Sequence, residues 1–408
     1  MSILGRFPAL TFPLYRRYWL ASLGSVGGWQ IAALAMGWLT FDLTGSALDL
    51  GILGAATAVP AILLTLVGGV IADRFNKRTV LLTTTAMNTL LLFALAAIDA
   101  LGLVSVWHVW LVAAGISLVS GVDWPTRQSF FPKLIDGSAM LSAVALNSVL
   151  WQFTRMVLPA TGGVLLALYD TALIFALAGC GYLIMWSVLL TLRVDLPGSK
   201  TSSPWQQTVE GITFILRQPL FRNLIILSYA TMFFLSSYMQ LMPAFADLFG
   251  AGPAGFGVLM SATGVGSILG TLLAGALPGN YGYGRWMLGG ALLAALLVIA
   301  FAQTALVGQF YAGMLLALGA ALGTSIFLIL STTILQIEVP EHLRGRVMGI
   351  HGITYSLMSL GGLLSGAIAQ QIGTPQAVMW CLSAYIVILL WVGFGNAQIR
   401  GLANPSPA

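Results

Sequence analysis

Long apolar runs separated by short polar connections dominate the chain. Most runs hold twenty or more mainly apolar residues, the length that a helix needs to cross a bilayer. Transmembrane barrels instead use alternating segments of about ten residues, so the pattern predicts an all-α membrane protein. The twelve predicted spans cover residues 18–41, 50–72, 79–101, 105–125, 141–168, 171–193, 221–247, 254–277, 285–304, 307–334, 345–372 and 376–397.

A polar stretch over residues 194–220 divides the predicted spans into two sets of six. Its second half, Trp205 to Arg217, alternates apolar with polar positions, which predicts a short amphipathic helix on the membrane surface. The chain is therefore expected to contain an N-terminal six-helix bundle, a cytoplasmic linker, a C-terminal six-helix bundle and a tail. These four parts cover residues 1–193, 194–220, 221–397 and 398–408.

The two halves repeat a pattern. The connection that begins at Gly69 has a counterpart 206 residues later at Gly275. The segment from Phe131, which follows the fourth span, has a counterpart 208 residues later that begins at Val339 and follows the tenth. Both offsets are close to half the chain, so we expect two pseudo-symmetric bundles. In rocker-type transporters such bundles hold the substrate between them near the midplane.

Composition excludes a soluble protein. Hydrophobic residues make up 58% of the chain and charged residues 7%, whereas soluble domains carry about 25% charged residues. The 17 basic residues against 12 acidic ones do not indicate nucleic-acid binding, because the bases are spread over many connections. Cys180 and Cys381 lie inside apolar spans and have neither disulfide-framework nor metal-ligand spacing.

The basic residues predict the orientation of the chain. Sixteen of the 17 fall in the N-terminal segment, in alternate connections, at the span ends beside those connections or in the tail, and Arg155 alone lies near the middle of a span. The remaining connections hold acidic residues without Lys or Arg. Because basic residues concentrate on the cytoplasmic side, both termini and the linker are expected in the cytoplasm. The acidic residues of the opposite connections are Asp42, Asp49, Asp99, Asp170 and Asp247.

The connection after the second span carries the most specific motif, Gly69-Val70-Ile71-Ala72-Asp73-Arg74-Phe75-Asn76-Lys77-Arg78. It resembles the loop signature of the major facilitator superfamily, G-x-x-x-D-R-x-G-R-R. It departs at Asn76, where the family prefers Gly, and at Lys77, where it prefers Arg. Asn tolerates positive φ better than other non-Gly residues, so we expect the same turn.

The resemblance implies a gate on the cytoplasmic side. In the family this loop latches the two halves together, and an acid at the end of span four pairs with a base of the loop. We therefore predict a Lys77–Asp123 contact, with Asp73 facing the start of span eleven. The gating set that the resemblance implies is Gly69, Asp73, Arg74, Lys77, Arg78, Asp123 and Arg127.

Two further stretches point to one branch of the superfamily. Asp123-Trp124-Pro125-Thr126-Arg127-Gln128, followed by Pro132 and Leu141 to Ser148, is similar to the branch of the enterobactin exporter and the macrolide efflux proteins, and so is Val339 to Met348. The resemblance runs from about Tyr15 to residue 397. It implies export across the bacterial inner membrane by proton antiport, without a cofactor.

Span five contains Leu158-Pro159-Ala160-Thr161-Gly162-Gly163. This stretch resembles the antiporter motif G-P-x-x-G-G, with Leu158 in place of the leading Gly. In the family the motif accompanies export, and it assigns Pro159, Gly162 and Gly163 to the antiporter motif. The alternative is an ordinary kinked packing face. Gly24/Gly28, Gly266/Gly270, Gly319/Gly323 and Gly362/Gly366 have the spacing of packing seams.

The substrate site is expected among polar and aromatic residues within the spans. Such residues recur at helical spacing in spans one, five, seven and eleven, and bulky, variable ligands suit aromatic surfaces. Packing between helices is the alternative for each stripe. A charge within a span costs at least about 2.5–3.5 kcal/mol, which favours a wet cavity or a partner for Arg155. The candidates are Gln30, Trp38, Trp151, Arg155, Tyr229, Phe233, Ser236, Gln240, His351 and Tyr355.

These observations predict a secondary active transporter that exports a small amphipathic drug or siderophore by alternating access, as a monomer in the lipid bilayer. The alternatives are a lysophospholipid flippase, an importer of the same fold, or a non-transporting membrane sensor or assembly subunit. Gly198-Ser199-Lys200-Thr201 lacks the first half of a phosphate loop, so no ATP use is expected. No enzyme, metal or nucleic-acid function is indicated, and the three histidines are far apart in sequence.

Overall fold

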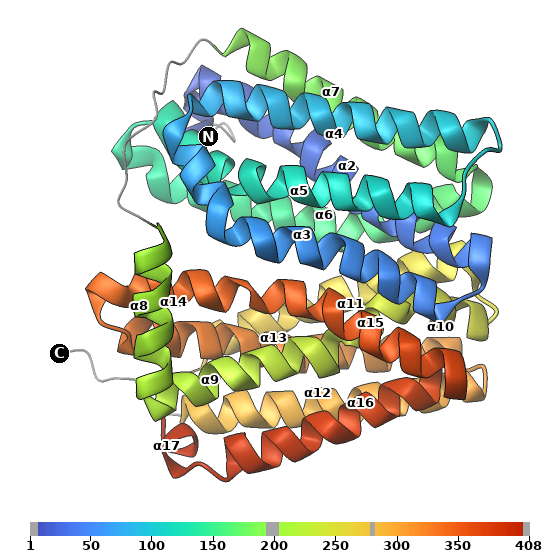
Figure 1. The fold of residues 1–408 in the computed structure, drawn as a ribbon, viewed down its shortest axis with the longest axis vertical. Coiled ribbons are helices and arrows are strands. Elements are labelled where there is room, and N and C mark those ends of the chain that lie inside the picture. The colour runs from blue at the N-terminus through green and yellow to red at the C-terminus, as the bar shows by residue number, and fades with distance from the viewer. Residues whose placement is uncertain (1–6, 193–203, 278–281, 403–408) are drawn as a thin grey trace. The chain divides into compact units, whose positions relative to one another are not determined.

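The computed structural model describes residues 7–192, 204–277 and 282–402, with the backbone alone for residues 65–73 and 204–208. Every regular element in these ranges is a helix (Figure 1). Twelve helical stretches within them are long and apolar enough to cross a membrane. The prediction of an all-α protein with twelve spans is confirmed.

Contacts between residues divide the chain into two compact units. Unit 1 comprises residues 1–43 and 59–204, and unit 2 comprises residues 44–58 and 205–408. The helices that supply unit 1 are η1 (Pro8–Thr11), α2 (Pro13–Thr44), α3 (Ala47–Arg74), α4 (Lys77–Ala100), α5 (Val106–Phe130), η2 (Phe131–Leu134), η3 (Gly137–Ala139), α6 (Met140–Leu168) and α7 (Thr171–Thr191).

The second segment of unit 2, residues 205–408, begins in α8, the short helix predicted in the second half of the linker. The crosswise course of α8 over α14 can be followed in Figure 1, and its place on a membrane surface stays a prediction. The helices of unit 2 are α8 (Pro204–Arg217), α9 (Pro219–Ala230), η4 (Thr231–Leu235), η5 (Ser236–Leu241), α10 (Met242–Leu248), α11 (Gly252–Gly275), α12 (Tyr283–Leu306), α13 (Phe310–Glu338), α14 (Glu341–Gly352), α15 (Thr354–Ile372), α16 (Thr374–Ile388), η6 (Leu389–Phe394) and α17 (Ala397–Arg400).

The start of α3 packs with unit 2, although it belongs to the first six spans in sequence. A Cβ added at Gly51 would lie 2.8 Å from the carbonyl oxygen of Gly362 on α15. Nearby, Nε2 of Gln240 on η5 donates to the carbonyl of Leu50 at 3.0 Å. Small residues permit this close backbone approach, so the division by contacts departs from the predicted division into six and six.

Asn76 ends the connection between α3 and α4 in a way the sequence did not predict. Its φ is −60°, and its Oδ1 accepts the backbone N–H groups of Arg78 (3.0 Å) and Thr79 (3.4 Å). The expected positive φ is therefore wrong. Asn76 instead acts as the N-cap of α4, a role in which Asn is among the favoured residues because it satisfies exposed N–H donors.

Three predicted spans are not continuous α-helices. Span seven passes from α9 through a π-helical turn, η4, and a 3-10 segment, η5. Span eleven breaks between Gly352 and Thr354, and span twelve ends in a π-helical turn, η6. Each of the three spans still contains a window that is apolar enough to cross a membrane, so hydropathy alone could not predict the breaks.

Glycines bring pairs of helices into backbone contact. On α2, an added Cβ at Gly24 would lie 2.9 Å from the carbonyl oxygen of Gly181, and one at Gly28 would lie 2.7 Å from that of Ala178, both on α7. The pair Gly266/Gly270 meets carbonyls of α13 in the same way. These glycines form packing seams, as predicted from their spacing.

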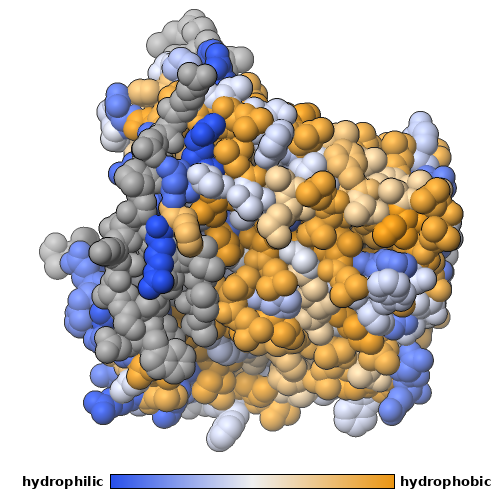
Figure 2. Space-filling model, turned by 45° about the horizontal axis from the view of Figure 1, so that its top comes forward, coloured by the Kyte–Doolittle hydropathy of each residue, from blue (hydrophilic) through white to orange (hydrophobic). Residues whose placement is uncertain are grey.

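Apolar side chains also cover the outside of the molecule. On the face drawn in Figure 2 they make a broad area, and hydrophilic residues gather toward the left and right margins of the view. Many large apolar side chains are exposed, Leu20, Leu90, Leu141 and Trp391 among them. An apolar surface of this extent fits lipid as the surrounding solvent.

The α2–α7 seam predicts the effect of one added methyl group. Gly181→Ala places a Cβ against the backbone of Gly24, which cannot move away without shifting α2. We expect a loss of about 1–3 kcal/mol in the free energy of unfolding, measured by loss of helicity during detergent-to-SDS titration. Gly289→Ala is the control, because nothing lies within 4 Å of its Cβ. Equal stability of the two variants would contradict the seam.

Candidate functional site

Three tryptophans from different helices of unit 1 meet at one place. The ring of Trp151 on α6 lies 6.0 Å from that of Trp29 on α2 and 5.2 Å from that of Trp124 on α5, edge-on in both cases. Trp29 is 40% exposed and Trp124 is 47% exposed. Aromatic rings in this geometry attract one another while keeping surfaces for a ligand. We call Trp29, Trp124 and Trp151 the tryptophan cluster.

The position of the cluster follows from the way α6 packs on α2. Leu158 replaces the leading Gly of the antiporter motif. Its side chain packs against Gly27 on α2, where an added Cβ would lie 3.0 Å from Cδ1 of Leu158. Gly162 of the motif makes room for Leu34 on α2. The motif therefore serves helix packing in unit 1, and its link to antiport stays a prediction.

Hydrogen bonds fix the other end of the same helix pair. The hydroxyl of Tyr15 donates to the carbonyl of Ala143 at 3.0 Å, and Nε1 of Trp19 donates to the carbonyl of Leu146 at 3.1 Å. Both donors lie on α2 and both acceptors on the first turns of α6. A buried hydrogen bond contributes about 1 kcal/mol and costs more when one partner is lost, so these bonds set the register of the two helices.

Arg155 follows Trp151 by four residues on α6, so both side chains lie on the same side of that helix. The side chain of Arg155 is exposed within unit 1. Gln128 follows Trp124 at the same spacing on α5 and is also exposed. A guanidinium and an amide thus extend the tryptophan cluster with donors, on helices that are otherwise largely apolar. This face combines aromatic contact area with positive charge.

A buried ion pair lies immediately behind Trp124. Asp123 pairs with Arg127 one turn later on α5, and its other oxygen accepts the hydroxyl of Thr84 on α4 at 2.6 Å. The side chains of Asp123 and Arg127 are only 12% and 13% exposed. Arg127 also donates to the hydroxyl of Ser25 on α2 at 3.3 Å. The network joins α2, α4 and α5, and so it fixes the helix that carries Trp124.

The predicted Lys77–Asp123 contact is wrong. Both oxygens of Asp123 are taken by Arg127 and Thr84, and no ion pair of Lys77 occurs among the described residues. Asp123 pairs with Arg127 instead of Lys77 because Arg127 lies one turn away on the same helix. Arg78, another residue of the loop motif, instead donates to the carbonyls of Leu189 (3.1 Å) and Leu190 (2.9 Å), close to the end of α7.

Other members of the predicted gating and substrate sets are dispersed in unit 1. Arg74 is exposed, and the surroundings of Gly69 and the side chain of Asp73 lie outside what the structure describes. Gln30 and Trp38 on α2 are half-buried. Their assignment to the substrate site stays a prediction.

Two of the six candidates in unit 2 donate hydrogen bonds to backbone carbonyls. The hydroxyl of Tyr229 donates to the carbonyl of Ile350 at 2.8 Å, and Gln240 is held by Leu50 as described above. Ser236 and His351 are buried, at 3% exposure each, Phe233 is half-buried and Tyr355 is 60% exposed. Unit 2 therefore offers no face on which these six candidates converge within the described residues.

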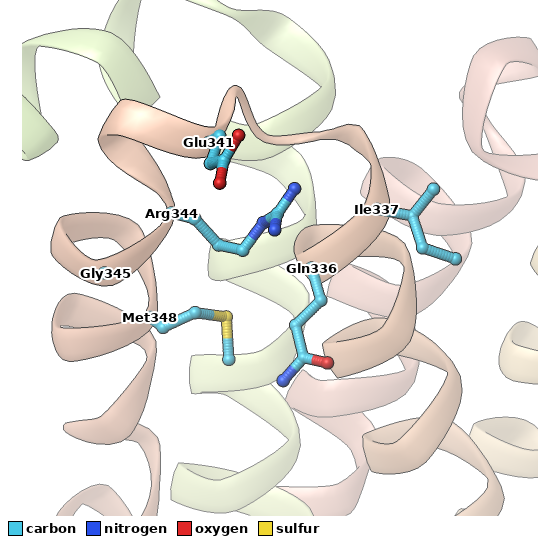
Figure 3. A pocket seen from close by; sticks show the side chains of 6 residues that line it. All are labelled: Gln336, Ile337, Glu341, Arg344, Gly345 and Met348. Carbon is cyan, nitrogen blue, oxygen red and sulfur yellow. The ribbon is translucent and has the colours of Figure 1, made fainter.

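A shallow pocket of about 780 Å³ lies at the corner between α13 and α14 (Figure 3). The view shows Glu341 and Arg344 at the start of α14, with Met348 and Gln336 below them. Its lining is Gln336, Ile337, Glu341, Arg344, Gly345 and Met348. The pocket is open, and it carries no aromatic surface. We therefore place the candidate substrate site at the tryptophan cluster instead.

Sequence reasoning found two members of this face, Trp151 and Arg155, and missed Trp29 and Trp124 as site residues. Trp124 stands beside Asp123 in the branch motif, and that position could have suggested that the two side chains point to different faces of α5. The grouping itself depends on how α2, α5 and α6 pack. No group of His, Cys, Asp and Glu that could hold a metal occurs in the residues described.

Comparison with known proteins places this architecture among transporters. The family model described as "Transmembrane secretion effector" matches residues 5–400. The enterobactin exporter EntS of Escherichia coli O1:K1 is 27% identical, over 94% of this chain and 92% of EntS. The multidrug efflux pump Tap of Mycolicibacterium fortuitum is 28% identical, over 94% of this chain and 95% of Tap.

A solved structure supports the fold. A point mutant of the nucleoside transporter NupG matches with a TM-score of 0.74 at 14% identity, over 94% of this chain and 99% of that chain. At this identity the likeness concerns the fold alone. The predicted major facilitator fold, the resemblance to the enterobactin exporter branch and the absence of an enzyme family are confirmed by these matches.

The buried ion pair predicts a strong coupling between Asp123 and Arg127. Asp123→Leu leaves the guanidinium of Arg127 buried without its counter-charge, which should cost about 3–5 kcal/mol in the free energy of unfolding. Adding Arg127→Met should restore much of this loss, because the pair is then replaced by apolar side chains. The same detergent-to-SDS titration measures Asp123→Leu, Arg127→Met and the double variant.

Lys77→Met supplies the matched comparison in a second double-mutant cycle. Its effect should add to that of Asp123→Leu within about 0.5 kcal/mol, because the two side chains do not pair. The network would be contradicted if the losses in the free energy of unfolding were additive for Asp123→Leu and Arg127→Met while Lys77→Met and Asp123→Leu were strongly coupled.

Proposed function

Because the chain belongs to the transmembrane secretion effector family of the major facilitator superfamily, we propose that it exports a small aromatic molecule that is anionic or rich in hydrogen-bond acceptors. Export proceeds from the bacterial cytoplasm by alternating access and is driven by proton antiport. The chain acts as a monomer in the inner membrane. The observation that carries this proposal is the tryptophan cluster with Arg155 beside it.

The chemistry of this face selects the class of substrate. Exposed edges and faces of Trp29 and Trp124 offer stacking surface to an aromatic ring. The guanidinium of Arg155 is planar and permanently charged, and it can donate two parallel hydrogen bonds to a carboxylate or to the paired oxygens of a catecholate. Within a span, such a charge interacts more strongly than in water because the surroundings are of low dielectric.

The names of these relatives give two classes of exported compound, enterobactin and multiple drugs. The positive charge at Arg155 distinguishes the two possibilities for this chain. A permanently cationic drug would meet an unfavourable potential at the tryptophan cluster, whereas an anionic aromatic molecule would meet a favourable one. We therefore propose the anionic or acceptor-rich class as substrate. A flippase for lysophospholipids, an importer and a non-transporting sensor remain the alternatives to this proposal.

The ion pair between Asp123 and Arg127 holds α5, the helix that carries Trp124, in place. Asp123, Arg127, Thr84 and Ser25 tie α5 to α4 and α2, so Trp124 is held while the substrate binds. A binding surface whose side chains are already fixed loses less entropy on association. The loop residues Asp73, Arg74 and Lys77 stay candidates for the cytoplasmic gate.

Arg155 provides the direct test of substrate choice. We expect Arg155→Ala to reach the membrane and to lose export of enterobactin by at least tenfold, because the bidentate donor is lost. Arg155→Lys should restore export only in part, since an ammonium cannot make two parallel bonds in one plane. Export is measured from cells that lack their own exporters, with the amount of transporter in the membrane determined for each variant.

Lys133→Ala is the matched control, because Lys133 is an exposed cation on η2, away from the tryptophan cluster. It should export enterobactin like the parent chain. Ethidium, a permanent cation, should be exported poorly by the parent chain. Unchanged enterobactin export by Arg155→Ala, or efficient ethidium export by the parent chain, would contradict the proposed substrate class.

The proposed orientation has its own test in unit 1. In a variant with Cys180 and Cys381 replaced by Ser, single cysteines at Asp42 and Lys133 occupy exposed positions near opposite ends of predicted spans. An impermeant thiol reagent added to intact cells should label the cysteine at 42 and spare the one at 133. The reverse labelling pattern would place the termini outside and reject export from the cytoplasm as proposed.

A further inference from the structure

The eleventh span is broken at Ile353, two residues after His351. Helix α14 ends at Gly352 and α15 starts at Thr354. The carbonyl of Ile350 accepts the hydroxyl of Tyr229 at 2.8 Å, and the hydroxyl of Thr354 donates to the carbonyl of His351. Side-chain hydroxyls thus bond the two backbone carbonyls at the break. The break is therefore a stable feature of the bundle.

A second irregular segment packs against this span. The π-helical turn η4 and the 3-10 segment η5 of span seven both contact α15. Gly361 on α15 lies so close to the carbonyl of Phe233 on η4 that any side chain at 361 would overlap it. Discontinuous spans that meet inside a transporter bundle are where ion and substrate sites occur. Two adjacent breaks make this part of unit 2 a candidate site.

The imidazole of His351 is buried beside this break, and one of its nitrogens is unpaired within the described part of the chain. Its residue is 3% exposed, and Nε2 has no hydrogen bond with any residue that the structure describes. Buried polar atoms in proteins are normally hydrogen-bonded, so an exception calls for a physical explanation. In the tautomer that carries hydrogen on Nδ1, the lone pair of Nε2 is available to bind a proton.

None of the ion pairs among the described residues involves the imidazole of His351. Within the described residues no carboxylate lies within 4 Å of His351, and Arg346 is paired with Glu210 on α8 at 2.5 Å. Tyr229 is bonded to the adjoining turn through the carbonyl of Ile350. The titratable or charged groups on the elements packed against this region and on α14 and α15 themselves are Asp49, Glu210, Arg217, Arg222, Tyr229, Tyr238, Tyr311, Glu338, Glu341, His342, Arg344, Arg346, Tyr355, Cys381 and Tyr385.

We propose that His351 is the proton-binding group of the transport cycle. This inference rests on the proposed proton antiport and adds the residue that carries it. A proton from water binds the Nε2 lone pair to give an imidazolium, and the same N–H bond breaks when the proton leaves to the other side of the membrane. Histidine suits the role because its charge ordinarily changes between pH 5 and pH 8.

Protonation at the break would change the structure around it. A buried imidazolium without a carboxylate is unfavourable unless it gains acceptors. Protonation would therefore favour an arrangement of α14 and α15 in which Nε2–H gains an acceptor. This preference gives the proton a differential interaction with two arrangements of these helices, which coupling requires.

Asp123, the best-buried carboxylate described in unit 1, is less suited to this role. Its oxygens are held by Arg127 and Thr84, so its protonation would break a buried ion pair that unites three helices. His351 can gain and lose a proton without such a partner. The structure thus separates the group that stabilises unit 1 from the group that we assign to coupling.

Direct titration of the ring is the first test. The protein is labelled with 15N-histidine, reconstituted in lipid nanodiscs, and compared with His351→Gln to assign the signals. The imidazole nitrogens of His351 should shift reversibly between pH 5 and pH 9, in a titration distinct from those of His108 and His342. A His351 signal that is constant over this range would overturn the proposal, whatever the variants do in transport.

Transport in proteoliposomes is the second test, with enterobactin as the probe. Counterflow, which needs no net proton movement, measures the working fraction of each preparation, and accumulation driven by an acidic lumen is normalised to it. His351→Gln should lose gradient-driven accumulation at least tenfold. His342→Gln is the matched control, because His342 is exposed at the start of α14, and it should accumulate enterobactin like the parent chain.

The outcomes separate the two proposals. Gradient-driven accumulation by His351→Gln equal to that of the parent chain would overturn the role of His351 while leaving antiport in place. Counterflow by the parent chain without any response to the gradient would reject antiport itself. Absence of counterflow in the parent chain would reject the proposed substrate. A His351→Gln protein without counterflow would leave the ring titration as the deciding measurement.

Discussion

A bilayer offers peptide groups and charges no hydrogen-bond partners, and this constraint shapes every part of the molecule described here. It requires helices in all twelve spans, and it lets the helices approach only where small residues remove the side chains between them. Gly24 and Gly28 on α2 meet the backbone of α7 for this reason. Polar side chains inside the bundles must then find partners in one another, and most of those described do so.

The same constraint explains how the candidate site is held. Asp123 and Arg127 neutralise each other inside unit 1, and Thr84 and Ser25 connect them to two further helices. Breaking the pair would strand a charge in an apolar bundle, so the network fixes the end of α5 strongly. Trp124, the next residue after Asp123, is thereby presented toward Trp151. A structural ion pair on one face of α5 thus positions an aromatic ring on a different face.

Hydropathy and charge predicted the spans well because lipid selects for long apolar helices with few exceptions. Local detail was harder to predict. Asn76 was expected to replace Gly in a turn with positive φ, whereas N-capping of α4 is the more favourable use of its side chain. Lys77 was expected to pair with Asp123, but Arg127 is nearer on the same helix. The tryptophan cluster and the break beside His351 depend on packing between helices, which no single-span pattern contains.

We propose that the export substrate binds the face formed by the tryptophan cluster and Arg155. A cryo-electron microscopy structure of the protein in a lipid nanodisc with enterobactin would show where the ligand lies. We predict an aromatic ring of the ligand packed within about 4 Å of Trp151, with its oxygens on the guanidinium of Arg155. Ligand density bound elsewhere on the protein, with Trp29, Trp124 and Trp151 uncontacted, would contradict it.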